Sequence, residues 1–406
     1  MKIENICAME VLDSRGNPTV MAKVILEDKS AGSACVPSGA STGQFEAVEL
    51  RDGGERYMGK GVEKAVSSVN NNIKSALLGK CALNQREIDE TLVKIDNTEN
   101  KGNLGANATL AVSLACARAA ADSLKIPLYR YLGGINAHLL PTPMLNIING
   151  GAHAQNNIDI QEFMIFPHGF ETFREKIEAS VNVYHTLKKL IKGGSGVGDE
   201  GGFAPSLSKD EEAFELILEA IQKAGYKAGE QFSLCVDVAS SDWHDGEKYT
   251  LPKSGKVYSA DELLKYYTKL CSDYPIVSIE DPFGENDWEA FAKITEQMKD
   301  KVQIVGDDLF VTNAKRLKKG IDMGAGSAIL IKPNQIGTLT ETLDAINLAK
   351  CSGYNTIISH RSGETSDTFI SDLAVAVNSG QIKTGAPARS ERTEKYNRLL
   401  EIEREL

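Results

Sequence analysis

The sequence predicts an α/β protein in which a C-terminal β/α barrel follows an N-terminal α+β cap domain. In the second half of the chain, strand-like and helix-like patterns alternate at intervals that suit one strand and one crossover helix, roughly 25–40 residues. Four short apolar runs there each end in a charged residue: 232–237, 276–280, 302–308 and 327–332. Because the strands of such a barrel end at one mouth, where the active site lies, we expect these charged ends to meet.

The first 125 residues have the patterns of a small α+β unit. In residues 20–26 the side chains would alternate between two faces of a strand, with Val20, Ala22, Val24 and Leu26 on one of them, which predicts a half-buried strand. Residues 62–78 have the apolar spacing of a helix, and a second helix is expected around residues 88–95. Residues 106–124 are rich in alanine and apolar nearly all round, so we expect a buried helix there.

The barrel is predicted to begin after a junction. Residues 126–144 hold Gly133, Gly134, Pro141 and Pro143, which favour an irregular connection. We therefore expect a cap domain at residues 1–130 and a barrel domain at residues 138–406. Ser259 and Thr338 are each followed three residues later by a glutamate, the capping-box pattern that begins a helix. Two more strand-like runs, 355–360 and 381–385, again end in polar residues.

Composition excludes several classes of protein. Of the 406 residues, 42% are apolar and 25% charged, which is ordinary for a globular enzyme. The 45 basic and 56 acidic residues give a net charge of −11, which disfavours nonspecific binding to nucleic acid or to an anionic membrane. Seven scattered cysteines without a C-x-x-C pair indicate reduced thiols. We find no secretory signal and no apolar run approaching 18 residues, so we expect a soluble, cytoplasmic protein without a membrane span.

Three acids at strand ends predict a metal site. Asp237, Glu280 and Asp307 would repel one another at the mouth, by about 4 kcal/mol for a pair about 4 Å apart at an effective dielectric near 20. A cation removes that repulsion, and oxygen ligands alone suit Mg²⁺, Mn²⁺ or Ca²⁺. The alternative is that each acid is simply a polar residue that ends a strand.

Lys332 ends an apolar strand at the same mouth. Beside divalent cations its charged form is disfavoured, so its pKa should fall and it could act as a base. The alternative is an ion-pair partner for the acids. Arg361, Ser362 and Lys383 follow two further strands and indicate a substrate that carries phosphate or carboxylate.

Each of three glycine-rich segments could have either a functional or a purely structural role. The hydroxyl-bearing loop 38–43 lacks the ending of a nucleotide P-loop and could be an ordinary surface loop. Residues 198–202 hold two acids between glycines, which suits either a ligand site or a plain turn. His153, which follows Gly150 and Gly151, is either catalytic or structural.

Taken together, these segments resemble the enolase family over essentially the whole chain. The motifs that carry the resemblance are DSRGNPTV, PSGASTG, NIINGG, QEFM, GDEGG, SIEDPF, GDDLFVTN, NQIGTLTET and SHRSGET. The resemblance implies an enolase-type barrel with its cap domain. It also implies a lyase of glycolysis that reversibly dehydrates 2-phospho-D-glycerate to phosphoenolpyruvate and depends on Mg²⁺, two ions per active site during turnover.

The resemblance also implies residue roles. Asp237, Glu280 and Asp307 match the ligands of a first Mg²⁺, and Ser41 matches a ligand of the second. Lys332 matches the base that removes the C2 proton, and Glu200 the acid that helps the C3 hydroxyl leave, with Glu162 in support. Substrate-contacting positions are His153, Gln161, Glu162, Lys332, His360, Arg361, Ser362 and Lys383. Since Glu200 would be buried near Glu162, we expect its pKa to be raised.

Two alternatives stay open at this point. Another barrel enzyme of the same superfamily, such as an acid-sugar dehydratase or racemase, would use a Lys-x-Lys pair or a histidine base, and residues 193–200 show no such pair. A binding protein that keeps the scaffold without turnover would bind metal and lack activity. The resemblance further implies a homodimer or an octamer, and leaves open an additional presence at the cell surface.

Overall fold

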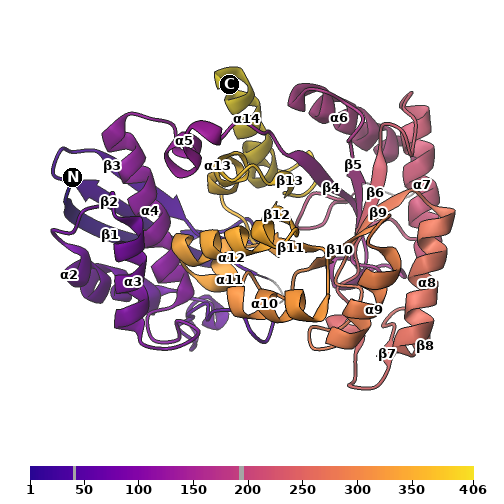
Figure 1. The fold of residues 1–406 in the computed structure, drawn as a ribbon, viewed down its shortest axis with the longest axis horizontal. Helices are drawn as coiled ribbons and strands as arrows, with labels where there is room; N and C mark the ends of the chain where they lie inside the picture. The colour runs from indigo at the N-terminus through magenta and orange to yellow at the C-terminus, as the bar shows by residue number, and fades with distance from the viewer. Residues whose placement is uncertain (40–42, 192–195) are drawn as a thin grey trace.

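The structure, a computed structural model, describes residues 1–39, 43–191 and 196–406. Its cap domain contains one antiparallel sheet of strand order β1-β2-β3 (Figure 1). The strands are β1 (Ile3–Leu12), β2 (Pro18–Leu26) and β3 (Ala31–Cys35). β2 buries Val20, Ala22, Val24 and Leu26 on one face. The strand predicted at residues 20–26, with its alternating faces, is confirmed.

The cap helices pack on this sheet and against one another. They are α1 (Glu63–Ser68), α2 (Lys74–Leu77), α3 (Gln85–Asp96) and α4 (Ala106–Leu124). A single π turn, Val69–Ile73, joins α1 to α2, so the helix predicted at 62–78 is present but irregular. α4 is buried nearly all round because it lies between the sheet and the barrel helices α11 and α12. Its backbone approaches β3 so closely that a Cβ atom at Gly32 would lie 2.3 Å from the Ala115 carbonyl oxygen.

The junction between the domains is more regular than the sequence predicts. Residues 126–144 contain a short helix, α5 (Leu128–Gly133), which packs on α13 of the barrel. The barrel begins at β4 (Thr142–Asn149). The domain bounds 1–130 and 138–406 stay predictions.

Eight strands form a closed barrel, in the order β10-β11-β12-β13-β4-β5-β6-β9 (Figure 1). After β4 they are β5 (Glu162–Phe166), β6 (Ser233–Asp237), β9 (Ile276–Glu280), β10 (Gln303–Gly306), β11 (Ala328–Ile331), β12 (Asn355–Ser359) and β13 (Gly380–Lys383). A small hairpin, β7 (Tyr249–Thr250) with β8 (Val257–Tyr258), lies outside the barrel order. The predicted α/β fold, a β/α barrel with an α+β cap, is confirmed.

One strand breaks the expected uniform direction. β5 runs antiparallel to both of its neighbours, β4 and β6. The connection agrees with this reversal: parallel neighbours are usually joined by a crossover helix, whereas residues 150–161, between β4 and β5, contain only the 3-10 turn Gly151–His153. Reversal brings the first residue of β5, Glu162, to the mouth where the other strands end.

A small apolar cluster fills the interior of the barrel, and helices surround it. These helices are α6 (Phe173–Leu190), α7 (Asp210–Lys223), α8 (Ala260–Asp273), α9 (Trp288–Met298), α10 (Ala314–Met323), α11 (Pro333–Ile336), α12 (Leu339–Cys351), α13 (Phe369–Ala376) and α14 (Ser390–Glu405). The interior cluster includes Met144, Met164 and Leu330.

The two predicted helix starts are both present. Ser259 begins α8 with a complete capping box. Thr338 begins α12 and accepts the Glu341 N–H, but the Glu341 carboxylate binds the Thr338 hydroxyl and Lys101 instead of closing the box. Among the described residues, none of the helices combines the length and apolar character that a bilayer crossing requires.

Candidate active site

The barrel strands bring acidic side chains to one level of the mouth. Asp237 ends β6 and pairs in register with Glu280, the last residue of β9. On its other side Asp237 pairs with Glu162 of the reversed strand β5. Asp307 directly follows β10, the next strand round the barrel. Three of these four positions were expected from the strand-end pattern, and Glu162 only from the family resemblance.

Basic groups arrive from the strands that complete the ring. Lys332 follows β11 and precedes Pro333, the first residue of α11. His360 follows β12. Lys383 ends β13 and pairs in register with Ser359. The polar strand ends predicted from the sequence therefore meet at one mouth.

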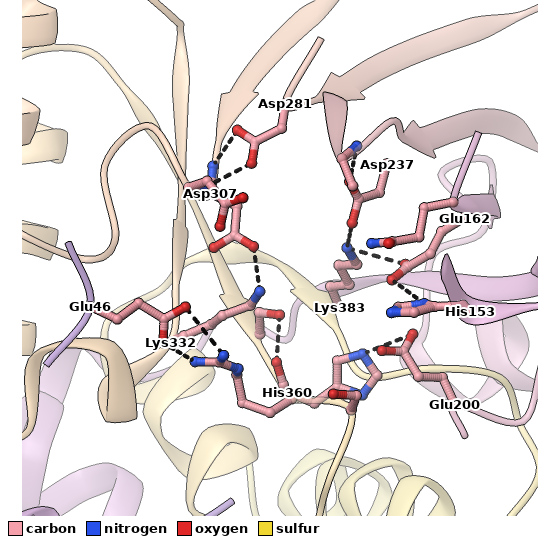
Figure 2. A pocket seen from close by; sticks show the side chains of 16 residues that line it. Glu46, His153, Glu162, Glu200, Asp237, Asp281, Asp307, Lys332, His360 and Lys383 are labelled. Carbon is pink, nitrogen blue, oxygen red and sulfur yellow. Dashed lines mark hydrogen bonds and ion pairs between the residues drawn. The ribbon is translucent and has the colours of Figure 1, made fainter. Parts of the chain in front are cut away.

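These side chains line one pocket (Figure 2). Its wall includes most of the predicted site residues, namely His153, Gln161, Glu162, Glu200, Asp237, Asp307, Lys332, His360, Arg361, Ser362 and Lys383. Glu280 lies against Lys383 rather than on the wall. Ser41 lies outside the described residues.

Lys383 is the cation that Asp237 and Glu280 share. Its Nζ lies 3.0 Å from Asp237 Oδ2, 2.9 Å from both Glu280 carboxylate oxygens and 3.1 Å from Glu162 Oε2. Burial lowers the pKa of Lys383, but the surrounding acids, Asp237 first, outweigh burial and hold the pKa well above its ordinary value. Burial, followed by the charge of Asp237, raises the pKa of Glu280 well above the ordinary range.

Lys332 and Asp307 form a second ion pair in the same pocket (Figure 2). The other oxygen of Asp307 accepts a hydrogen bond of 2.9 Å from Gln335 Nε2. Burial disfavours both charges, yet the pair overcomes it: the pKa of Asp307 falls and that of Lys332 rises. The sequence predicts a lowered pKa for Lys332 beside divalent cations. Without such cations, Asp307 stabilises the ammonium form of Lys332 and raises its pKa.

A different pair of acids, Glu162 and Glu200, lies beside two imidazoles. His153 Nδ1 is 3.6 Å from Glu162 Oε1, and His360 Nε2 is 3.5 Å from Glu200 Oε2. Glu200 also accepts a 3.1 Å hydrogen bond from Asn146 Nδ2. Burial, and then the negative charge of Glu200, raise the pKa of Glu162 well above its ordinary value.

The pKa of Glu200 moves in the opposite direction. Burial alone would raise it, but the charge of His360, with those of His153 and Arg392, holds it well below its ordinary value. The expectation of a raised Glu200 pKa is wrong, because these three neighbours are not visible in the local sequence. Of the two glutamates, Glu162 has the raised pKa and Glu200 the lowered one.

Glu46, Asp281 and Asp308 also line the pocket, although the sequence analysis did not predict them as site residues. Glu46, from the cap domain, forms a buried ion pair with Arg361, with one NH1 to Oε2 distance of 2.8 Å. Asp281 accepts the backbone N–H groups of Asp307 and Asp308, at 2.9 and 2.8 Å, and so orients Asp307. Asp281 and Asp308 could have been found because each directly follows a predicted ligand, whereas nothing marks Glu46.

The donors fit a hard divalent cation. Asp237, Glu280 and Asp307 are buried carboxylates, and their present partners are the two ammonium groups of Lys383 and Lys332. Among the described residues, the acid and histidine groups whose ligand atoms lie within 4.8 Å of one another are His153, Glu162 and Glu200, and Asp281, Asp307 and Asp308. The predicted trio is not one of these groups, since Lys383 lies between Asp237 and Glu280. Its oxygen chemistry and burial nevertheless suit Mg²⁺.

Known proteins match this chain from end to end. The family model described as "Enolase, N-terminal domain" matches residues 3–132, and that described as "Enolase, C-terminal TIM barrel domain" matches residues 137–406. A curated relative, the protein named Enolase from Sulfurimonas denitrificans, is 58% identical over 409 aligned residues. The alignment covers 100% of this chain and 97% of that relative.

Proposed function

The chain belongs to the enolase family and is a lyase, and on that premise we propose that it reversibly dehydrates 2-phospho-D-glycerate to phosphoenolpyruvate in a Mg²⁺-dependent reaction of glycolysis. Lys332 is the base at C2, and Glu200 is the acid for the C3 hydroxyl, with Glu162 in support. The observation that carries the proposal is the pocket itself, where the amine of Lys332 and the carboxyl groups of Glu162 and Glu200 line one cavity.

Binding comes first in the proposed reaction. Arg361, Lys383 and Ser362, with the imidazoles of His153 and His360 and the amide of Gln161, supply the donors that a phosphate and a carboxylate require. Mg²⁺, when held by Asp237, Glu280 and Asp307, supplies Lewis-acid stabilisation for the charge that develops on the substrate carboxylate. Ser41 is proposed as a ligand of the second Mg²⁺ ion.

Proton removal is the task of Lys332. A proton beside a carboxylate is weakly acidic because its removal builds a second negative charge on the same group. An amine acts as a base only when neutral, and the pKa of Lys332 is raised by Asp307 after burial has lowered it. Arg361 and Lys383 act against this rise. For Lys332 to act as the base, Asp307 must therefore interact with another cation instead of with Lys332.

Loss of the hydroxyl requires a proton. Hydroxide is a poor leaving group, so the acid must deliver a proton as the bond breaks. Glu162 has the raised pKa and Glu200 the lowered one, with ligand atoms of the two within 4.8 Å. We propose that the two glutamates share one proton, which Glu162 stores and Glu200 delivers.

An absorbance assay tests this function. The purified protein with Mg²⁺ and 2-phosphoglycerate should give the ultraviolet absorbance of the enol product, and a chelator should stop the rise. Absence of any rise at every Mg²⁺ concentration would reject the proposal. Metal binding without turnover would instead favour a binding protein that has kept the scaffold.

The setting of the enzyme is also part of the proposal. We propose a homodimer or an octamer that acts in the cytoplasm, binds no nucleic acid and uses two Mg²⁺ ions per site during turnover. Light scattering of the purified protein measures its assembly. A monomer at micromolar concentration would contradict the oligomeric part while leaving the reaction itself untouched.

A further inference from the structure

Arg392 is a fully buried arginine on the C-terminal helix α14, and it is aimed at the loop that carries His360. Its NH1 atom lies 2.7 Å from His360 Nδ1 and donates to the Arg361 carbonyl oxygen at 2.6 Å. Its NH2 atom donates to the carbonyl oxygens of Ser362 at 2.7 Å and Asp199 at 2.9 Å. One guanidinium therefore joins the His360 loop to the residue that precedes Glu200.

The contact with Nδ1 fixes the protonation pattern of the imidazole. A guanidinium has only donors, so Nδ1 of His360 must accept. A neutral imidazole that accepts at Nδ1 carries its proton on Nε2. Burial, together with the charge of Arg392 and against that of Glu200, lowers the pKa of His360 to about 4, so the ring is neutral near pH 7. The contact at Nδ1 therefore selects the Nε2–H tautomer of the neutral ring.

The opposite nitrogen faces the pocket. Nε2 of His360 is buried and makes no hydrogen bond within the described part of the chain, and it points toward Glu200 Oε2, 3.5 Å away (Figure 2). A donor in this position can bind an acceptor that enters between the imidazole and the carboxyl. The reversed tautomer would present a lone pair to Glu200 and would repel its anionic form.

We propose that Arg392 is a positioning residue that holds His360 as the Nε2–H tautomer, so that a neutral imidazole donates toward Glu200 and the substrate. This proposal rests on the proposed role of Glu200 for its effect on turnover. The tautomer itself is independent of that role. It is set by the arrangement of α14 against the loop, and it exists before any substrate binds.

Lys395 provides the matched control. It lies on the same helix, is equally buried, and holds the same loop through the Thr365 carbonyl oxygen at 2.6 Å and the Glu364 carboxylate at 2.9 Å. Within the described part of the chain, its Nζ makes these contacts and none with His360. A loop that merely needed a buried cation on α14 would respond to loss of Lys395 in the same way as to loss of Arg392.

The test is nitrogen NMR of protein labelled with ¹⁵N at its histidine rings. A His360→Gln variant identifies the His360 signals among the six histidines. At pH 7 the unmodified protein should show a protonated Nε2 and an unprotonated Nδ1 at His360. Arg392→Met should shift His360 toward the Nδ1–H form, and Lys395→Met should leave the tautomer unchanged.

Turnover gives the second measurement. In Arg392→Met, kcat should fall about 10- to 100-fold with little change in KM, a part of the 10²–10⁴-fold that a positioned proton-transfer group contributes. Arg392→Lys keeps one donor for Nδ1 and should recover the tautomer and some of the rate.

An Nδ1–H or doubly protonated His360 in the unmodified protein overturns the proposal, even when Arg392→Met does not fold. So does an Nε2–H tautomer that survives in Arg392→Met, or the same shift in Lys395→Met. Failure of the absorbance assay with the expected tautomer present would count against the proposed function only.

Discussion

Two sets of buried acids share one pocket, and their partners differ. Asp237, Glu280 and Asp307 face the ammonium groups of Lys383 and Lys332, and we refer to them as the lysine-paired acids. Glu162 and Glu200, the glutamate pair, lie beside the imidazoles of His153 and His360, and Glu162 also lies 3.1 Å from Lys383 Nζ (Figure 2). Against the effect of burial, Asp307 raises the pKa of Lys332, whereas burial and the charge of Glu200 together raise the pKa of Glu162. The difference teaches that the proposed base, Lys332, is paired with an acid, whereas the proposed proton donor, Glu200, lies beside a second carboxyl whose pKa is raised.

Removal of Lys332 tests the lysine-paired set most severely. Lys332→Ala should lower kcat by about 10⁴-fold, the upper end of what general base catalysis contributes. Substrate should still bind, because Arg361 and Lys383 remain in the pocket. Steady-state kinetics and titration calorimetry measure the two effects. Lys318→Ala, at an exposed lysine of α10, is the control. Retained turnover in Lys332→Ala would remove Lys332 from the base role.

The glutamate pair should respond differently at its two members. Glu200→Gln keeps the shape of the side chain but cannot deliver a proton, so dehydration should slow by about 10²–10³-fold. Exchange of the C2 proton with deuterated solvent should continue, since Lys332 is intact. Glu162→Gln resembles the protonated form that the raised pKa of Glu162 favours, and its loss should be smaller.

The order of these two losses decides how the proton is handled. Rates of dehydration and of isotope exchange, measured on the same samples, give the answer. A larger loss in Glu162→Gln would make Glu162 the delivering acid. Loss of isotope exchange in Glu200→Gln would mean that the two sets are not separate.

Glu46, in the cap domain, forms an ion pair with Arg361, which lines the pocket. Its ion pair with Arg361 is buried, with side-chain exposures of 6% and 4%. Removing one partner of a buried pair leaves the other charge uncompensated, so Glu46→Gln should lower the free energy of unfolding by about 3 kcal/mol. KM should rise as well, because Arg361 loses its orienting partner. Urea denaturation and kinetics measure both.

An exposed ion pair between the same two domains is the control. Arg86 on α3 binds Asp344 on α12 at 2.8 Å, with side-chain exposures of 59% and 44%. Asp344→Asn should cost less than about 1 kcal/mol, because water screens exposed pairs. Equal losses in Glu46→Gln and Asp344→Asn would show that burial does not govern the cap–barrel contact.

The strand ends of the pocket could be predicted from the sequence, while its proton chemistry could not. Asp237, Glu280 and Lys332 follow apolar runs, and the barrel geometry brings such ends together. The direction of the Glu200 shift depends on His360 and Arg392, which lie more than 150 positions away in the chain. Glu46 was missed for the same reason, since its partner Arg361 is known only from the packed structure. Long-range charge contacts leave no periodic pattern.

A carboxyl outside the pocket shows the effect of burial with no cation at all. Asp210 begins α7 and accepts the backbone N–H groups of Asp159 and Ile160, at 2.8 and 3.2 Å, just before Gln161 of the pocket. Burial raises its pKa from 3.8 to about 6, although the Ile160 hydrogen bond opposes the rise. Asp210 should therefore change its charge near pH 6.

The consequence for stability follows from the sign of that shift. Because the folded-state pKa is raised, the stabilisation by Asp210 is complete below about pH 3.8 and is lost as the pH rises through about 6. A shift of about two units corresponds to about 3 kcal/mol. Asp210→Asn cannot ionise, so its free energy of unfolding relative to the unmodified protein should increase by up to that amount between pH 4 and pH 7. Urea denaturation at several pH values measures the difference, and Glu230→Gln, at an exposed acid, should show none. Parallel curves for Asp210→Asn and the unmodified protein would mean that Asp210 is already ionised across this range, and that burial without a cation does not hold a proton in this fold.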